Sequence, residues 1–191
     1  MASAVILAAG ASRRMGSSKA LLPLGDGCLL SAHLAVLSRQ VAEIFVVGGA
    51  VFEEFLEPCG VHGARLIRNS AWDTTMPIDS LRLALSHGLS APCVVTPVDT
   101  APVSDADLGR LLAHPDGAVL SYQGRPGHPV VLGEKQIAAV CGVVEDTAVN
   151  TSLSQGLRDI VAGLERLDSV NADCLLNFNT PEDWGSWRGC S

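Results

Sequence analysis

The stretch from Val5 to Leu24, V-I-L-A-A-G-A-S-R-R-M-G-S-S-K-A-L-L-P-L, restricts the possible folds of this chain more than any other. An apolar run, Val5 to Leu7, passes directly into residues with small side chains, and then into two arginines and a lysine. Short apolar runs that end in turn-forming residues are typical of buried strands. The stretch therefore predicts a strand that ends in an anion-binding loop.

The residue types of this loop favour phosphate as the anion. Across Ala8–Ala11 the side chains are small or missing, so backbone N–H groups can approach a ligand closely. Arg13, Arg14 and Lys19 add three cations, and guanidinium groups combined with an ammonium suit a polyphosphate better than a lone carboxylate. We expect a nucleoside triphosphate as the ligand.

The loop differs from the two commonest phosphate-binding loops. Lys19 is followed by Ala20, so the hydroxyl that a Walker A loop supplies to magnesium is missing, and the G-x-G-x-x-G pattern of dinucleotide-binding folds is absent. From the residues alone, a surface turn with solvated arginines stays an alternative.

The complete string carries a family resemblance. The fixed positions Leu7-Ala8-Ala9-Gly10-x-Ser12-x-Arg14-Met15-Gly16-x-x-Lys19 resemble the signature L-A-A-G-x-S-x-R-M-G-x-x-K of the MobA-like nucleotidyltransferases. This family includes molybdenum cofactor cytidylyltransferases and guanylyltransferases. The resemblance implies a Mg²⁺-dependent enzyme that moves a nucleoside monophosphate from a nucleoside triphosphate to a small phosphorylated acceptor such as molybdopterin. Pyrophosphate would be released.

The remaining chain alternates strand-like apolar runs with segments of helical spacing. This pattern and the resemblance predict a three-layer α/β/α Rossmann-like nucleotidyltransferase fold with a mostly parallel mixed sheet. With 191 residues and no linker or repeat, residues 1–191 are expected to form a single domain. Strands are expected at 5–7, 44–47, 65–68, 93–99, 118–122, 130–132 and 164–167. Helices are expected at 29–41, 51–56, 78–89, 104–112, 137–140 and 153–161, and a strand followed by a helix at 175–184.

A second region, 69–89, resembles the family stretch N-x-x-W-x-x-G-M-x-x-S-L. Thr75 replaces its glycine and adds a side chain where the backbone would approach the substrate. Trp72 has the alternative interpretation of an ordinary packing residue. The resemblance and the loop together predict nucleotide binding by Leu7, Ala8, Ala9, Gly10, Ala11, Ser12, Arg13, Gly16, Asn69, Met76 and Ser80.

Catalysis and metal binding are expected near Asp99, which ends an apolar strand. A carboxylate at a strand end beside a phosphate loop suits Mg²⁺, although such an aspartate is more often a turn or cap residue. The resemblance implies that Arg14, Lys19 and Asp99 are catalytic and that Asp99 and Asn179 hold the metal. Asn179 stands where the family has a second aspartate, so the expected metal affinity is lower.

The acceptor is expected at Gly127 and His128, within the string G-H-P-V that resembles one in the cytidylyltransferases. Together with Ala9 this string favours CTP as the donor. The run 145–150 replaces a family run near the acceptor, so the acceptor can differ. Open alternatives are guanylyl transfer, transfer to another small acceptor, and a nucleotide-binding module without turnover.

Charge and composition exclude other classes of protein. The net charge is −7 and the only lysines are Lys19 and Lys135, which argues against a nucleic acid partner. The N-terminal apolar run is too short for a secretion signal or a membrane span, so we expect a cytoplasmic protein without a membrane partner. We expect a monomer or a weak homodimer.

Overall fold

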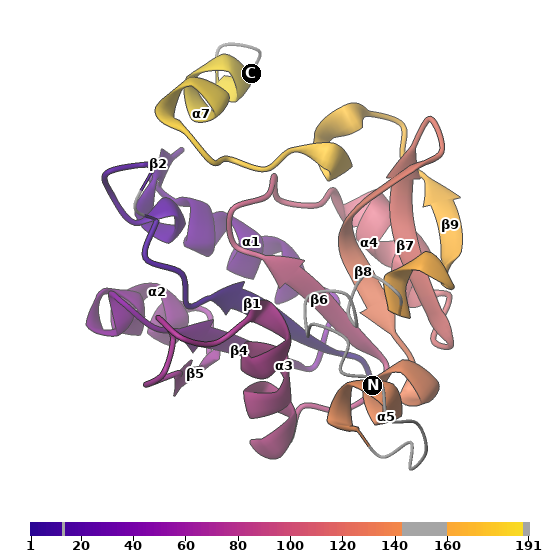
Figure 1. The fold of residues 1–191 in the computed structure, drawn as a ribbon. Coiled ribbons are helices and arrows are strands. Elements are labelled where there is room, and N and C mark those ends of the chain that lie inside the picture. The colour runs from indigo at the N-terminus through magenta and orange to yellow at the C-terminus, as the bar shows by residue number, and fades with distance from the viewer. Residues whose placement is uncertain (13, 143–159, 189–191) are drawn as a thin grey trace.

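The computed structural model describes residues 1–12, 14–142 and 160–188 (Figure 1). A sheet within them has the strand order β5-β4-β1-β6-β8-β7-β9. Neighbouring strands are parallel, except that β8 runs antiparallel to β6 and β7. The expected mostly parallel mixed sheet is confirmed. The strands are β1 (Ser3–Ala8), β4 (Glu43–Gly48), β5 (Arg65–Arg68), β6 (Cys93–Pro97), β7 (Gly117–Tyr122), β8 (Arg125–Leu132) and β9 (Glu165–Asp168), with β2 (Pro23–Leu24) and β3 (Gly27–Cys28) as a separate hairpin.

Helical segments pack on both faces of this sheet. The helical segments of the described residues are η1 (Lys19–Leu21), α1 (Leu29–Leu37), η2 (Phe52–Phe55), α2 (Leu56–Val61), α3 (Pro77–Ser86), α4 (Asp105–Leu112), α5 (Glu134–Cys141), η3 (Ala172–Leu175) and α7 (Pro181–Arg188). Successive side chains of a strand point to opposite faces. Ile6 of β1 accordingly packs in the cluster that holds α1 and α4, and Val5 packs in the cluster that holds α3 and α5.

A third apolar cluster lies beyond the sheet and joins the two ends of the chain. It consists of Met15, Leu22, Leu29, Ala101, Phe178 and Trp184. In Figure 1, α7 and β2 lie at the same end of the molecule. The C-terminal helix is therefore packed against the segment that follows β1.

Two helix predictions are wrong at their ends. The helix expected at 29–41 ends at Leu37, because the chain turns at 38–40 to enter β4. The helix expected to stop before Pro58 is instead a 3-10 turn, η2, followed by α2, which runs through Pro58. Proline is tolerated there because the first turn of a helix has no intrahelical partner for its N–H groups.

The connection between β7 and β8 is shorter than the strands expected at 118–122 and 130–132 imply. Gln123 and Gly124 both have positive φ, 50° and 75°. This is the geometry of a two-residue hairpin turn, so β8 begins at Arg125 and His128 lies on a strand. Pairing of Val119 with Val130 and of Ser121 with Pro126 leaves 127–129 opposite one residue of β7, which forms a bulge.

The strand expected near 175–177 is also wrong. The 3-10 helix η3 ends at Leu175, and beyond it Asn177 contributes a single isolated bridge to Thr100. The helix that follows is confirmed as α7, with Pro181 at its first position. Residues 153–159 of the helix expected at 153–161 lie outside the described residues.

Candidate functional site

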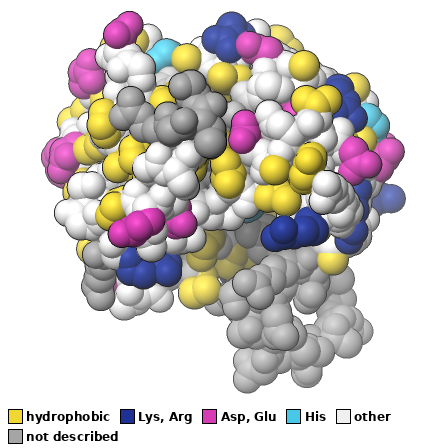
Figure 2. Space-filling view, turned by 90° about the horizontal axis from the view of Figure 1, so that it is seen from above, with side chains coloured by type: hydrophobic (Ala, Val, Ile, Leu, Met, Phe, Trp, Pro, Cys, Tyr) yellow, Lys and Arg dark blue, Asp and Glu magenta, His cyan; other side chains and the backbone are white. Residues whose placement is uncertain are grey.

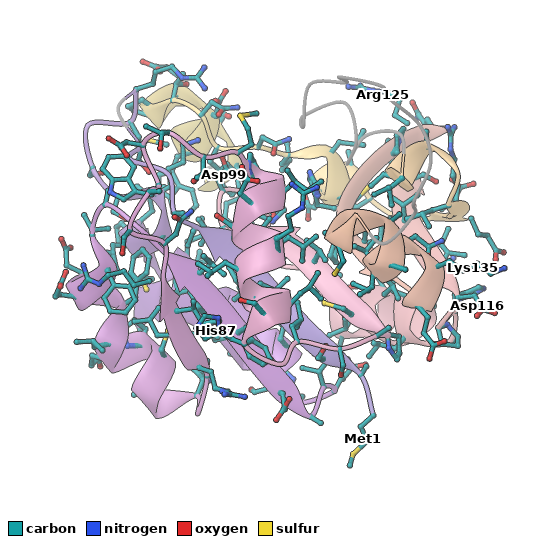
Figure 3. The ribbon with its side chains drawn as sticks, turned by 60° about the horizontal axis from the view of Figure 1, so that its bottom comes forward. Met1, His87, Asp99, Asp116, Arg125 and Lys135 are labelled. Carbon is teal, nitrogen blue, oxygen red and sulfur yellow. The ribbon has the colours of Figure 1, made fainter. Side chains whose placement is uncertain are left out.

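The site lies at the carboxyl ends of β1 and β6, where the order of the strands reverses. The chain passes from β1 to β4 and β5 on one side, and then returns to β6 on the other side of β1. Ligands of open α/β sheets bind outside the strand ends at such a switch point. Figure 3 shows Asp99 at the end of the molecule opposite Met1 and His87.

Ser12 shapes the loop that follows β1. Its backbone has a φ of 51°, which is uncommon for a residue other than glycine. Its carbonyl oxygen accepts a bond from the Met15 N–H at 2.9 Å, and its Oγ accepts one from the Lys19 N–H at 3.0 Å. Gly16 takes a φ of 75° in the same loop. Ser12 thereby fixes where the side chain of Lys19 begins.

A cleft of about 310 Å³ opens beside this loop. Seven of the residues predicted from the sequence line it, and Pro77 and Pro97 belong to its wall. The seven are Leu7, Ala8, Gly10, Ser12, Arg14, Lys19 and Asp99. The structure thus brings the loop, the arginine, the lysine and the carboxylate to one cleft, which is large enough for part of a nucleotide.

Lys19 is the centre of a polar cluster in this cleft. Its Nζ donates to Asp99 Oδ2 at 2.7 Å and to Asn179 Oδ1 at 3.0 Å. Arg14 Nη2 donates to the same Asn179 oxygen at 3.3 Å. The side chains of Lys19 and Asp99 are only 12% and 28% exposed, so solvent screens this pair less than a surface pair.

Two hydrogen bonds hold the backbone at Asp99 and Thr100 in place. The Asp99 carbonyl oxygen accepts from the Phe178 N–H at 2.7 Å. His33 of α1 donates from Nε2 to the Thr100 carbonyl oxygen at 3.0 Å. Burial lowers the pKa of His33 from 6.5 to about 4, so the ring is neutral at pH 7. Sequence reasoning missed His33, although its place between Leu30 and Leu34 on the apolar face of a helix was a usable signal.

A second cavity of about 140 Å³ adjoins the cleft at Leu7, Gly10 and Pro77. Its other lining residues include three of the predicted nucleotide-binding residues that do not line the cleft, Ala9, Met76 and Ser80. The remaining two are Trp72 and Thr75. The region around 69–80 and the loop after β1 therefore form one continuous recess.

Asn69 organises the wall of this second cavity. It is buried, and its Nδ2 donates to Thr75 Oγ1 at 2.9 Å and to Ser80 Oγ at 3.2 Å. Its Oδ1 accepts from the Ala71 N–H at 3.1 Å. Thr75 Oγ1 also donates to the Ala71 carbonyl oxygen at 3.0 Å. Asn69 thus fixes the loop rather than lining the cavity itself, and Thr75 is tied into the same network.

Gly49 is a further residue that sequence reasoning did not single out. A Cβ at this position would collide with the carbonyl oxygen of Ala9 and with Cβ of Trp72. The loop after β1 and the tryptophan can approach each other only because Gly49 has no side chain. The doublet Gly48-Gly49 at the end of a strand was the available signal.

Asn179 is held in place by the start of α7. Asp183 Oδ2 accepts from the N–H groups of Asn179 and Thr180, both at 2.9 Å, and the Asp183 N–H donates to Thr180 Oγ1 at 3.2 Å. These backbone donors lower the pKa of Asp183. The arrangement is a capping box, which sets where the Asn179 side chain begins.

The residues expected at the acceptor do not line the cleft. His128 lines a separate cavity of about 100 Å³ with Ser104, Asp107 and Cys174. Its Nδ1 is buried with no hydrogen-bond partner among the described residues, and burial lowers its pKa. Gly127 packs against η3, where a Cβ would collide with the Cys174 carbonyl oxygen.

The remaining expected positions contribute less to this geometry. Ala11 and Gly16 lie in the loop but line neither the cleft nor the second cavity. Arg13 and the run 145–150 lie outside the described residues. Within residues 1–12, 14–142 and 160–188, no group of three or more His, Cys, Asp or Glu side chains is placed to hold a metal ion.

Charges on the visible surface are mixed. On the face seen in Figure 2, the Lys and Arg side chains are interspersed with Asp and Glu and form no continuous basic patch. In the described part of the chain, no helix is both long and apolar enough to cross a lipid bilayer.

Comparisons with known proteins agree with this architecture. A family model described as the MobA-like NTP transferase domain matches residues 4–170. A molybdenum cofactor guanylyltransferase of Xanthomonas euvesicatoria is 29% identical, covering 94% of this chain and 90% of the relative. A molybdenum cofactor cytidylyltransferase of Escherichia coli is 26% identical, covering 94% and 92%. The solved structure of a nucleotidyl transferase from Methanothermobacter is 26% identical, covers 100% and 97%, and has a TM-score of 0.78.

Proposed function

Since the chain belongs to the MobA-like NTP transferase family and is a nucleotidyltransferase, we propose that it transfers a nucleoside monophosphate to the phosphate of molybdopterin. An oxygen of the acceptor phosphate attacks the α-phosphorus of a nucleoside triphosphate. The bond from the α-phosphorus to the bridging oxygen breaks, and pyrophosphate leaves. The cluster of Arg14, Lys19, Asp99 and Asn179 in the cleft carries this proposal.

The cations of the cluster suit the charges of this reaction. Arg14 and Lys19 approach one point in the cleft from the loop after β1, where the backbone can also face a phosphate. Preorganised positive charge stabilises the extra negative charge that develops on the α-phosphate and on the leaving pyrophosphate. Holding the acceptor phosphate and the α-phosphate in line accelerates the reaction further, and no side-chain nucleophile is required.

A divalent cation fits the oxygen atoms of the same cluster. Asp99 Oδ2 and Asn179 Oδ1 both lie within 3.0 Å of one nitrogen atom, so a single small cation can contact both. Mg²⁺ is commonly held by one or two carboxylates together with substrate phosphates. Bound there, Mg²⁺ would offset charge on the phosphate oxygens as a Lewis acid. The site has one carboxylate, so its affinity depends on the phosphates of the substrate.

We propose CTP as the donor, with GTP as the alternative. Ala9 lies in the wall of the second cavity, which would receive the base beside Trp72 and Ser80. The L-A-A-G string and the G-H-P-V string support CTP. The curated relatives include both a guanylyltransferase and a cytidylyltransferase, so they do not separate the two bases.

For the acceptor, we propose that His128 supplies a hydrogen bond through Nδ1, which has no partner in the described part of the chain. The bulge of β8 places His128 behind the segment that follows Asp99, where it lines a small cavity. A neutral imidazole has one donor and one acceptor nitrogen, so Nδ1 can serve an acceptor molecule in either tautomer. Transfer to another small phosphorylated acceptor would use the same chemistry.

Substitution of two cluster residues tests the reaction. Lys19→Ala and Asp99→Ala are expected to abolish pyrophosphate release and to leave the fold intact. Lys135→Ala and Asp116→Ala are matched controls, because these exposed residues lie far from Asp99 in Figure 3. Full activity in either cluster variant would refute the proposal. Tight triphosphate binding without pyrophosphate release in the unaltered protein, with molybdopterin present, would favour a nucleotide-binding module.

A further inference from the structure

The Lys19 ammonium contacts the same two oxygen atoms that a divalent cation would use. Asp99 Oδ2 lies 2.7 Å and Asn179 Oδ1 lies 3.0 Å from its nitrogen. The Lys19 side chain is only 12% exposed, so its charge lies inside the cleft wall and not in bulk solvent. The protein therefore supplies its own cation to these two oxygens.

The backbone segments that carry the two oxygens are anchored independently of Lys19. The backbone of Asp99 is bonded to Phe178, and the backbone of Asn179 is bonded to Asp183. The Lys19 backbone is held as well, by Ser12 Oγ and by the Leu22 N–H, but its ammonium stands at the end of a flexible four-carbon chain, whereas the Asp99 and Asn179 oxygens are carried on short side chains. Of these three groups, the ammonium is the one that can move.

A divalent cation and the ammonium cannot share this place. A metal bound to both oxygens would stand directly beside the ammonium, and their repulsion is strong where water is largely excluded. Arg14 brings a further positive charge to the Asn179 oxygen. No cluster of three carboxylate, histidine or cysteine ligands in the described residues would compensate a metal for displacing the lysine.

We propose that Lys19 and a divalent cation bind Asp99 and Asn179 alternately, so that the metal enters only together with a triphosphate. The phosphates of the donor draw the ammonium away from the two oxygens, and the metal then binds Asp99, Asn179 and the phosphates. This order of binding rests on the proposed function, because it needs a triphosphate in the cleft. It makes Lys19 the residue that keeps free metal out of the site.

Titration with Mn²⁺ alone, followed by the electron paramagnetic resonance signal of free Mn²⁺, tests the first half of this proposal. We expect a wild-type Kd at least about tenfold weaker than that of Lys19→Met or Lys19→Gln. Lys135→Met changes the net charge equally and should behave like wild type. The tighter Mn²⁺ binding of Lys19→Met should disappear when this substitution is combined with Asp99→Asn. Thermal melting checks that each variant is folded.

Two results would overturn the proposal that Lys19 competes with a divalent cation. One is a wild-type affinity for Mn²⁺ equal to that of Lys19→Met. The other is a tighter Mn²⁺ affinity of Lys19→Met that persists when the Asp99 carboxylate is removed, because the metal would then bind elsewhere. If both Lys19 variants fail to fold, a wild-type Kd in the low micromolar range for Mn²⁺ alone would by itself overturn the proposal, and a millimolar Kd would support it.

The second half is tested with a non-hydrolysable CTP analogue. Wild type is expected to bind the analogue more tightly with Mn²⁺ than with EDTA, and Asp99→Asn should remove this difference. If Mn²⁺ has no effect on wild type, the metal does not enter with the triphosphate and the proposal fails. If the CTP analogue and the corresponding analogues of GTP, ATP and UTP all fail to bind under either condition, the proposed function fails, while the Mn²⁺ titration remains a separate test of the competition.

Discussion

The backbone N–H of Phe178 donates a 2.7 Å hydrogen bond to the carbonyl oxygen of Asp99. This bond joins the turn that follows β6 to the segment that precedes α7, beside the bridge between Thr100 and Asn177. The same segment carries Asn179, which contacts Arg14 and Lys19. Residues beyond 170, the last residue that the family model matches, therefore complete the cluster in the cleft.

Truncation of Trp184 should weaken both the fold and the site. Trp184 is buried, and its ring meets that of Phe178 edge-to-face with centroids 5.0 Å apart. We expect Trp184→Ala to lower the free energy of unfolding by about 3 kcal/mol and to reduce triphosphate affinity, because α7 holds Asn179. Urea unfolding and nucleotide titration measure the two effects.

Leu56→Ala is the control for Trp184→Ala. Leu56 is 57% exposed on α2 and belongs to none of the three buried clusters. Its truncation should cost less than about 1 kcal/mol and leave nucleotide affinity unchanged. Equal nucleotide affinity in Trp184→Ala and Leu56→Ala would show that α7 does not position the cluster.

His33 should make the fold sensitive to acid. Its pKa falls from 6.5 to about 4 because the ring is buried in α1. Between these values the unfolded chain binds a proton that the folded protein does not, so stability is complete above pH 6.5 and is lost as the pH falls towards 4. Full loss amounts to on the order of 3 kcal/mol. The lowered pKa of His128 acts in the same direction.

Melting temperatures between pH 7 and pH 4 measure this effect. His33→Gln retains an N–H donor for the Thr100 carbonyl oxygen but does not titrate, so its melting temperature should fall less than that of wild type over this range. His87→Gln is the control, because His87 is exposed at the far end of α3 in Figure 3. If the melting temperatures of His33→Gln and wild type fall equally between pH 7 and pH 4, His33 is not the source of the acid sensitivity.

Gly49→Ala should close the second cavity. The new Cβ would meet backbone at Ala9 and the first side-chain atoms of Trp72, neither of which can move without shifting the loop or the chain. We expect at least a tenfold loss of triphosphate affinity, measured by titration. Gly60→Ala in α2 is the control, since a Cβ there has no neighbour within 4 Å and should leave binding intact. Unaltered binding by Gly49→Ala would remove this cavity from the nucleotide site.

Asn69→Ala should loosen the same cavity without filling it. The substitution leaves Thr75 Oγ1, Ser80 Oγ and the Ala71 N–H without the Asn69 partner. Loss of a buried hydrogen-bonding group costs about 1–3 kcal/mol in unfolding free energy. Asn69→Ala should also lower nucleotide affinity, because the wall of the cavity loses these hydrogen bonds. Asn171→Ala is the control, since it removes only the cap of η3 and should leave nucleotide affinity unchanged. Wild-type affinity in Asn69→Ala would contradict a role for this network.

The sequence predicts the sheet because its signals are local. Apolar runs such as Cys93–Val98 and helical spacing at Ile78, Leu81 and Leu85 give each element its type, and the alternation gives the parallel order. The sequence also predicts that Arg14, Lys19 and Asp99 lie close together, because the carboxyl ends of parallel strands share one edge of the sheet.

What the sequence does not predict depends on contacts between distant segments. The role of Gly49 arises from the approach of Ala9 to Trp72, and the role of His33 arises from its contact with Thr100. The strand expected at 130–132 begins too late, because the turn that starts it at Gln123–Gly124 needs a glutamine with positive φ, which carries little local signal. The packing of Phe178 and Trp184 on Met15 likewise joins opposite ends of the chain.

Transfer of a radioactive label from the donor to the acceptor tests the central claim most directly. With CTP labelled at the α-phosphate, molybdopterin should acquire the label in wild type and not in Asp99→Asn, and one pyrophosphate should be released for each label transferred. With CTP labelled at the γ-phosphate, the label should leave with pyrophosphate. Labelling of molybdopterin from the γ-phosphate would contradict nucleotidyl transfer, as would the absence of α-label transfer from each of the four nucleoside triphosphates.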